Sequence, residues 1–194
     1  MPLGFHKAAL FGVAGVSTGD VVLLSSQTAS GDASIDFTSG IDSTYGEYIF
    51  RFYDISGMDE TLLHFQVNAS GESGYNETIT SSAFFSRHTE ADDAAAMGYQ
   101  GSEDQAQGTG YQALSEEAHE DADASVCGEL HLFNPSSTTY VKHFYARTIG
   151  MQKSEGVWDA FNAGYINTTT AITGISFKPS GGTFSGKIKM WGVK

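Results

Sequence analysis

Six histidines and one acidic segment are the parts of this 194-residue chain that could support metal binding or acid–base chemistry. The histidines stand at positions 6, 64, 88, 119, 131 and 143. No two of them form an H-x-x-x-H or H-E-x-x-H pair, so a histidine metal site would need ligands from distant segments. His64, His131 and His143 lie in alternating segments beside aromatic residues, where a histidine packs its ring and hydrogen-bonds a neighbour.

The acidic segment runs from position 89 to 125 and holds ten Asp or Glu residues and neither Lys nor Arg. Within it, Asp121 and Asp123 alternate as the oxygen ligands of calcium loops do, which makes them the candidate ligands for Ca²⁺. The glycine and the bidentate glutamate of a calcium loop are missing, so a solvated acidic loop is the alternative. No other cofactor is expected.

Two patterns could indicate catalysis. GVSTG at positions 15–19 matches G-x-S-x-G, but that motif needs a strand before the serine and a helix after it. Here the strand-like VVLLSS follows Ser17 instead. Asp92 and Asp93 are a carboxylate pair, but neighbours in a strand point apart, so nothing sets a glycosidase separation. We predict that the protein is not an enzyme.

Composition narrows the class of partner. A net charge of −13 argues against an ordinary nucleic-acid surface and against adhesion to anionic membranes. No run of about 18 apolar residues is present, so no transmembrane helix is expected. Cys127 is the only cysteine, which excludes an intrachain disulfide.

Period-two alternation recurs along the chain and predicts an all-β fold. In EYIFRFYDI the side chains of Tyr48, Phe50 and Phe52 share one face, and together with Phe84 and Phe85 they are predicted core residues. Roughly nine or ten strands at regular spacing indicate an antiparallel β-sandwich or jelly roll.

The predicted strands occupy a single domain over residues 20–194, preceded by an apolar, Gly-rich N-terminal arm over residues 1–19. The acidic segment, about residues 89–125, interrupts the strand pattern. One interpretation is a solvated excursion with a helical turn at EADDAAAM, which Thr89 could cap. The other is a loop that binds a partner or a cation.

The stretch from Glu129 to Thr148, ELHLFNPSSTTYVKHFYART, predicts two strands joined by a turn at Asn134–Ser137. Its alternation places His131 and His143 within those strands, in a hairpin or strand-crossing pair.

Charge is segregated along the chain, because four of its ten basic residues lie in the last seventeen positions: Lys178, Lys187, Lys189 and Lys194. In a symmetric assembly this basic edge could meet the acidic segment of a neighbour. We therefore expect Lys187 and Lys189 to contact other subunits. Phe5, Leu10 and Phe11 of the arm are the residues expected to dock into a groove.

GELHLFNPSSTTYVKHFYART and the closing FSGKIKMWGV are among several distinctive segments that extend from about Val21 onward. In these segments the chain resembles a family of small virion structural proteins of tailed phages, common in phages of aquatic bacteria.

The resemblance implies a non-enzymatic capsid decoration (cement) protein that binds the major capsid protein or other virion proteins. It also implies a homo-oligomer, with a trimer favoured, assembled in the host cytoplasm and located on the virion. The alternative is the receptor-binding or glycan-binding head domain of a tail or head fibre. The chain shows neither the heptads nor the repeats of a fibre shaft, which favours decoration.

Overall fold

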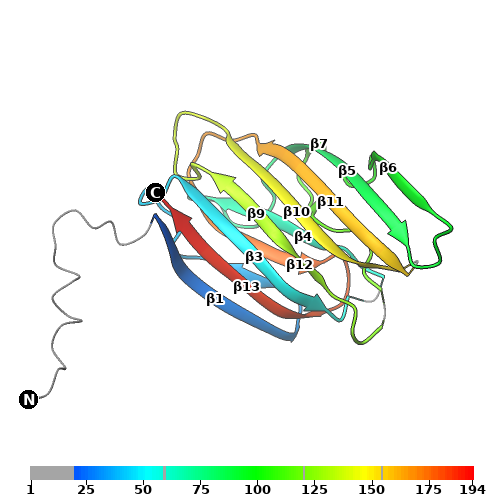
Figure 1. The fold of residues 1–194 in the computed structure, drawn as a ribbon. Helices are drawn as coiled ribbons and strands as arrows, with labels where there is room; N and C mark the ends of the chain where they lie inside the picture. Colours follow the sequence, from blue (N-terminus) through cyan, green and yellow to red (C-terminus); the bar gives the residue numbers. More distant parts are fainter. Residues whose placement is uncertain (1–19, 59, 120, 154) are drawn as a thin grey trace, which may run out of the picture.

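The computed structural model describes residues 20–58, 60–119, 121–153 and 155–194, and within these ranges it is all-β. Two antiparallel sheets pack face to face as a sandwich (Figure 1). The predicted all-β class and antiparallel sandwich are confirmed, and the jelly-roll connection stays a prediction. Residues 1–19, with Ser17, Phe5, Leu10 and Phe11, lie outside the described ranges. No helix in those ranges is long and apolar enough to cross a bilayer.

The large sheet has nine strands. Its order is β1 (Val21–Asp32), β13 (Phe184–Val193), β3 (Glu47–Ser56), β9 (Val126–Phe133), β10 (Lys142–Gln152), β11 (Gly156–Ile166), β5 (Ile79–Thr89) and β6 (Ala95–Tyr99), with β7 (Ala106–Gly108) also paired to β5. The small sheet has four strands, in the order β2 (Ile35–Phe37), β12 (Ile172–Pro179), β4 (Leu63–Ala69) and β8 (Gln112–Ala113).

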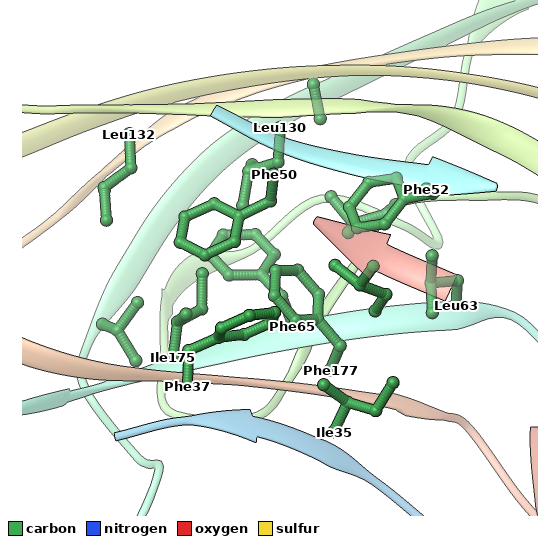
Figure 2. Packing of buried hydrophobic residues seen from close by; sticks show 14 of the residues in the cluster. Ile35, Phe37, Phe50, Phe52, Leu63, Phe65, Leu130, Leu132, Ile175 and Phe177 are labelled. Atoms are coloured by element: carbon green, nitrogen blue, oxygen red, sulfur yellow. The ribbon is translucent and has the colours of Figure 1, made fainter. Parts of the chain in front are cut away.

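The core fills the space between the sheets, and aromatic side chains dominate its centre (Figure 2). Phe177 of the small sheet is fully buried. Its ring centroid lies 5.3 Å from those of both Phe50 and Phe52, and 6.2 Å from that of Phe37. The predicted inward face of Tyr48, Phe50 and Phe52 is confirmed. Because alternate residues of a strand point to opposite faces, the same pattern sends Arg51 outward.

The acidic segment is a solvated excursion only in its first part, where β6 and the turn before it are largely exposed. It contains β6, β7 and β8, which raises the number of strands above the predicted nine or ten. Its middle lies beneath β5 and β11, on the inner face that the small sheet leaves uncovered. Leu114 is fully buried there, and its carbonyl accepts hydrogen bonds from Thr148 Oγ1 at 2.5 Å and Asn162 Nδ2 at 3.3 Å.

The predicted helical turn at EADDAAAM is wrong, because these residues form the hairpin turn between β5 and β6 and the start of β6. Thr89 organises that turn. Its hydroxyl donates to Asp93 Oδ1 at 2.7 Å and accepts from the Ala94 N–H at 3.0 Å. Asp92 takes a left-handed conformation with φ of 56°, which a hairpin turn uses and a helix does not.

The predicted pairing of the two histidine-containing strands is confirmed, since β9 and β10 are antiparallel neighbours. The turn also forms, because the Ser137 N–H donates to the Asn134 carbonyl at 3.0 Å and closes a turn around Pro135 and Ser136.

Replacing Phe177 by Ala should remove the ring that three other phenylalanines contact. We expect the free energy of unfolding to fall by about 3–5 kcal/mol, because a large cavity opens in a core that cannot collapse fully around it. Urea unfolding monitored by circular dichroism measures the change. Met97→Ala is the control, since Met97 is 78% exposed and its loss should change stability little. Equal stability losses in the two variants would contradict this account of the core.

Because His64, on the outer face of β4, has a lowered pKa, we expect the stability of the fold to depend on pH. Burial, with a smaller contribution from the Lys178 ammonium, lowers the pKa of His64 from its usual 6.5 to about 4. Between pH 6.5 and 4 the unfolded chain therefore binds a proton at His64 that the folded chain does not. The stability contribution of His64 is complete above pH 6.5 and is lost as the pH falls toward 4.

Because one pKa unit corresponds to about 1.4 kcal/mol, the wild-type chain should lose up to about 3 kcal/mol more than His64→Gln between pH 7 and pH 4. Urea unfolding at a series of pH values gives both profiles. Parallel profiles would show that the fold does not hold His64 neutral.

Candidate functional site

The outer face of the large sheet, which points away from the core, is the candidate interaction surface. Directly paired residues of antiparallel strands lie on the same face, so the strand register places one row of side chains across eight strands. In order from β1 to β6 the row is Ser26, Lys189, Arg51, Glu129, Arg147, Phe161, Phe84 and Tyr99. The row is basic near the β1 edge and aromatic near the β6 edge.

At the aromatic end of this row, the side chains hold one another in place. Phe84 and Phe161 stack with ring centroids 4.7 Å apart and planes 2° from parallel. The Arg147 guanidinium covers Phe161 at 4.9 Å, and it is held there by two hydrogen bonds to Asp159, of 2.9 and 2.7 Å. Phe84 remains 46% exposed and Tyr99 61% exposed. These side chains offer aromatic ring faces and one oriented cation to a binding partner.

The prediction that Phe84 is a core residue is therefore wrong. Adjacent residues of a strand face opposite sides, so only Phe85 of the pair points inward. There its ring stacks on that of Trp158 at 4.2 Å.

The basic end brings together the two lysines that the sequence singled out. Lys187 and Lys189 both lie on the outer face of β13, where Lys187 pairs with Tyr53 and Lys189 pairs with Arg51. The Lys189 ammonium also lies 5.1 Å from the centre of the Tyr53 ring. Arg51 Nε is 3.2 Å from a carboxylate oxygen of Glu129 on the next strand. Lys187 and Arg51 are both exposed.

His131 lies on β9, in the middle of the large sheet, where it is paired with Tyr145 of β10. Its ring stacks on Tyr145 with centroids 4.4 Å apart, and its Nδ1 lies 2.5 Å from Glu47 Oε1. Its Nε2 is 3.2 Å from Glu129 Oε1, although without the geometry of a hydrogen bond. His131 is buried, with 8% of its surface exposed, and it packs its ring and bonds a neighbour, as predicted for a histidine in a strand.

His143 has different surroundings, because it is exposed on β10 and faces Tyr165 at 6.4 Å between ring centroids. The two histidines of the β9–β10 pair therefore do not form one site.

The candidate Ca²⁺ ligands lie near the last residue of β10, at the end of the sandwich opposite to His143. Asp121 is beside His119, whose Nδ1 is 3.4 Å from Asp121 Oδ2 and accepts the Asp121 N–H at 3.1 Å. Asp123 is exposed. Within residues 20–58, 60–119, 121–153 and 155–194, no group of three or more His, Cys, Asp or Glu side chains could hold a metal ion. Calcium binding at Asp121 and Asp123 stays a prediction that needs a further ligand.

A hollow of about 630 Å³ lies where the outer face meets the loop between β9 and β10. Its lining consists of Phe133, Asn134, Ser136, Ser137, Tyr140, Val141 and His143. Tyr140 is 72% exposed. The sequence analysis recognised the turn in this stretch but not the hollow, because Tyr140 and Val141 follow the turn and their exposure depends on how the loop is held.

Comparisons of the chain with protein-family models, with curated protein sequences and with solved structures gave no match. The chemistry of the outer face and the layout of the sheet edges are therefore the structural basis for a functional proposal.

Proposed function

We propose that this chain is a non-enzymatic structural protein of a tailed-phage virion, which assembles as a homo-oligomer and decorates the outer surface of the head shell. The resemblance of its sequence to small virion proteins is one support. The observation that carries the assembly part is the large sheet itself, whose two edge regions differ in charge.

The first edge is β1, which is twelve residues long and pairs with β13 on one side. Edge strands are usually protected by lysines, prolines or short length, because their free N–H and C=O groups can pair with another chain. The β1 strand has neither Lys nor Pro, and Asp32 at its end is its only charged residue. Within the described part of the chain, its outer edge is thus available for pairing.

The second edge is β6 at the opposite side of the sheet (Figure 1). The hairpin turn that leads into it carries Glu90, Asp92 and Asp93, whereas β13 beside the first edge carries Lys187 and Lys189. Opposite charges on opposite edges favour a contact between the β1 side of one copy and the β6 side of the next. Such a head-to-tail contact is heterologous, and it forms a ring where the rotation between successive copies closes. A ring of three copies matches the trimer that the family resemblance implies.

A charge reversal tests this arrangement. We expect the wild-type chain to associate in solution. We expect Lys187→Glu/Lys189→Glu to weaken association at least tenfold, because the two carboxylates that replace the lysine ammonium groups would repel the acidic turn of the neighbouring copy. Sedimentation velocity over a range of protein concentrations, at low and at high salt, measures the change.

A change of charge in the acidic turn on the opposite edge is the matched control. Adding Glu90→Lys and Asp92→Asn to the lysine variant should restore part of the association, and Asn tolerates the left-handed conformation at position 92. The edge-to-edge contact is contradicted if the wild-type chain stays monomeric at all concentrations, or if Lys187→Glu/Lys189→Glu associates as tightly as wild type.

The N-terminal arm, with Phe5, Leu10 and Phe11, is proposed to dock on the shell or on a neighbouring subunit. A chain lacking residues 1–19 should keep its fold and lose binding to particles of the phage that encodes it. Co-sedimentation with purified particles measures binding, and circular dichroism checks the fold. Undiminished particle binding by the truncated chain would remove the arm from the proposal.

A further inference from the structure

We propose that the hollow beside the β9–β10 loop is a binding site for a neutral glycan, with the Tyr140 ring as its stacking platform. The loop consists of residues 134–141. The site is independent of the assembly proposed above, because it lies at the loop end of the outer face and involves neither edge strand.

The lining of the hollow combines the two kinds of group that sugar recognition needs. Tyr140 and Phe133 supply aromatic rings, on which the C–H faces of a pyranose stack. Asn134, Ser136 and His143 supply hydrogen-bond donors and acceptors for hydroxyl groups. The volume of about 630 Å³ lies within the range of about 300–1,000 Å³ that is typical of small-molecule sites.

The exposure of Tyr140 is the second observation. Tyr140 is 72% exposed, and within the described residues its side chain makes no hydrogen bond and no aromatic contact, although its backbone is firmly held. The aromatic surface continues from the hollow along the outer face, because Phe133 lies 5.7 Å from Tyr145 between ring centroids. A chain of sugars could therefore extend from the hollow onto the sheet.

The loop is fixed at its start by contacts with distant segments. The Asn134 N–H donates to the Gly46 carbonyl at 2.7 Å, and the Pro135 carbonyl accepts from the Ile172 N–H at 2.8 Å. These two bonds tie the beginning of the loop to the residue before β3 and to the first residue of β12.

The second half of the loop is fixed by Ser137 and Lys142. The Ser137 hydroxyl accepts from the N–H groups of Thr139 and Tyr140 at 3.2 and 3.1 Å. The Lys142 ammonium, which is fully buried, donates to the carbonyls of Tyr140 at 3.2 Å and Thr168 at 3.1 Å. An exposed aromatic on a loop held this firmly loses little conformational entropy when a ligand binds.

The uncharged lining selects the class of glycan. None of the residues that line the hollow is Asp, Glu, Lys or Arg. An anionic sugar would therefore find no cation in this lining to pair with its carboxylate or sulfate. A neutral oligosaccharide needs only ring faces and hydroxyl partners, and the lining supplies both.

The test uses the full-length chain and a panel of neutral hexaoses built from glucose, mannose, xylose, galactose and N-acetylglucosamine. Saturation-transfer NMR and calorimetry should detect binding of at least one of them. We expect Tyr140→Ala to weaken that binding at least tenfold and Tyr140→Trp to retain it. Val157→Ala is the matched control, because Val157 is also exposed, at 53%, but lies at the start of β11 and does not line the hollow.

Lys142→Met tests whether binding needs a firmly held loop in addition to the Tyr140 ring. The variant keeps the apolar stem of the side chain and removes the two hydrogen bonds, so binding should weaken although Tyr140 is still present. The proposal is overturned if no neutral hexaose binds, if Tyr140→Ala binds as tightly as wild type, or if Tyr140→Ala and Val157→Ala weaken binding equally. Binding only of sulfated or uronic oligosaccharides, abolished by salt, would also overturn it.

Discussion

A sheet of nine strands cannot be covered on its inner face by a sheet of four, and the strands at one side need another cover. Residues that follow β6 provide it, with Leu114 buried at the centre. Covering a sheet with irregular chain buries backbone groups that require partners, and unpaired ones would each cost about 1–3 kcal/mol. Thr148 and Asn162 satisfy the Leu114 carbonyl from the sheet side, and Gln112 Nε2 donates to the Glu103 carbonyl at 2.7 Å. The acidic segment is thus part of the sandwich.

This arrangement leaves the other face of the large sheet as a broad surface crossed by one row of side chains. At its aromatic end Arg147 is bonded to Asp159 and covers Phe161, and at its basic end Arg51 is paired with Glu129. The same width separates the two edge regions, so the lysines of β13 and the acids of the β5–β6 turn lie on opposite sides of the molecule. Assembly through the edges would leave the hollow beside the β9–β10 loop open. One subunit could therefore join its neighbours and also bind the proposed glycan.

Local alternation was sufficient to predict the parts of the fold in which one face of a strand is buried. It predicted the inward aromatic residues of β3 and the pairing of β9 with β10. It was not sufficient for the acidic segment, because alanine and acid content resembles a solvated loop and the buried partners of Leu114 are more than thirty positions away. Phe84 was misplaced because two adjacent aromatics cannot both face the core from one strand. Lys187 and Lys189 were singled out from charge alone and their contact with other subunits stays a prediction, whereas Tyr140 required the loop geometry.

Amide hydrogen exchange at the two edges tests the central claim, that copies of this chain join through β1 and β6. Exchange should be measured at concentrations below and above association. The account predicts that association slows exchange in Val21–Asp32 and in Ala95–Tyr99, and leaves the interior strand β9 unchanged. Equal exchange at both edges in the associated and dissociated states, or protection confined to another surface, would contradict it.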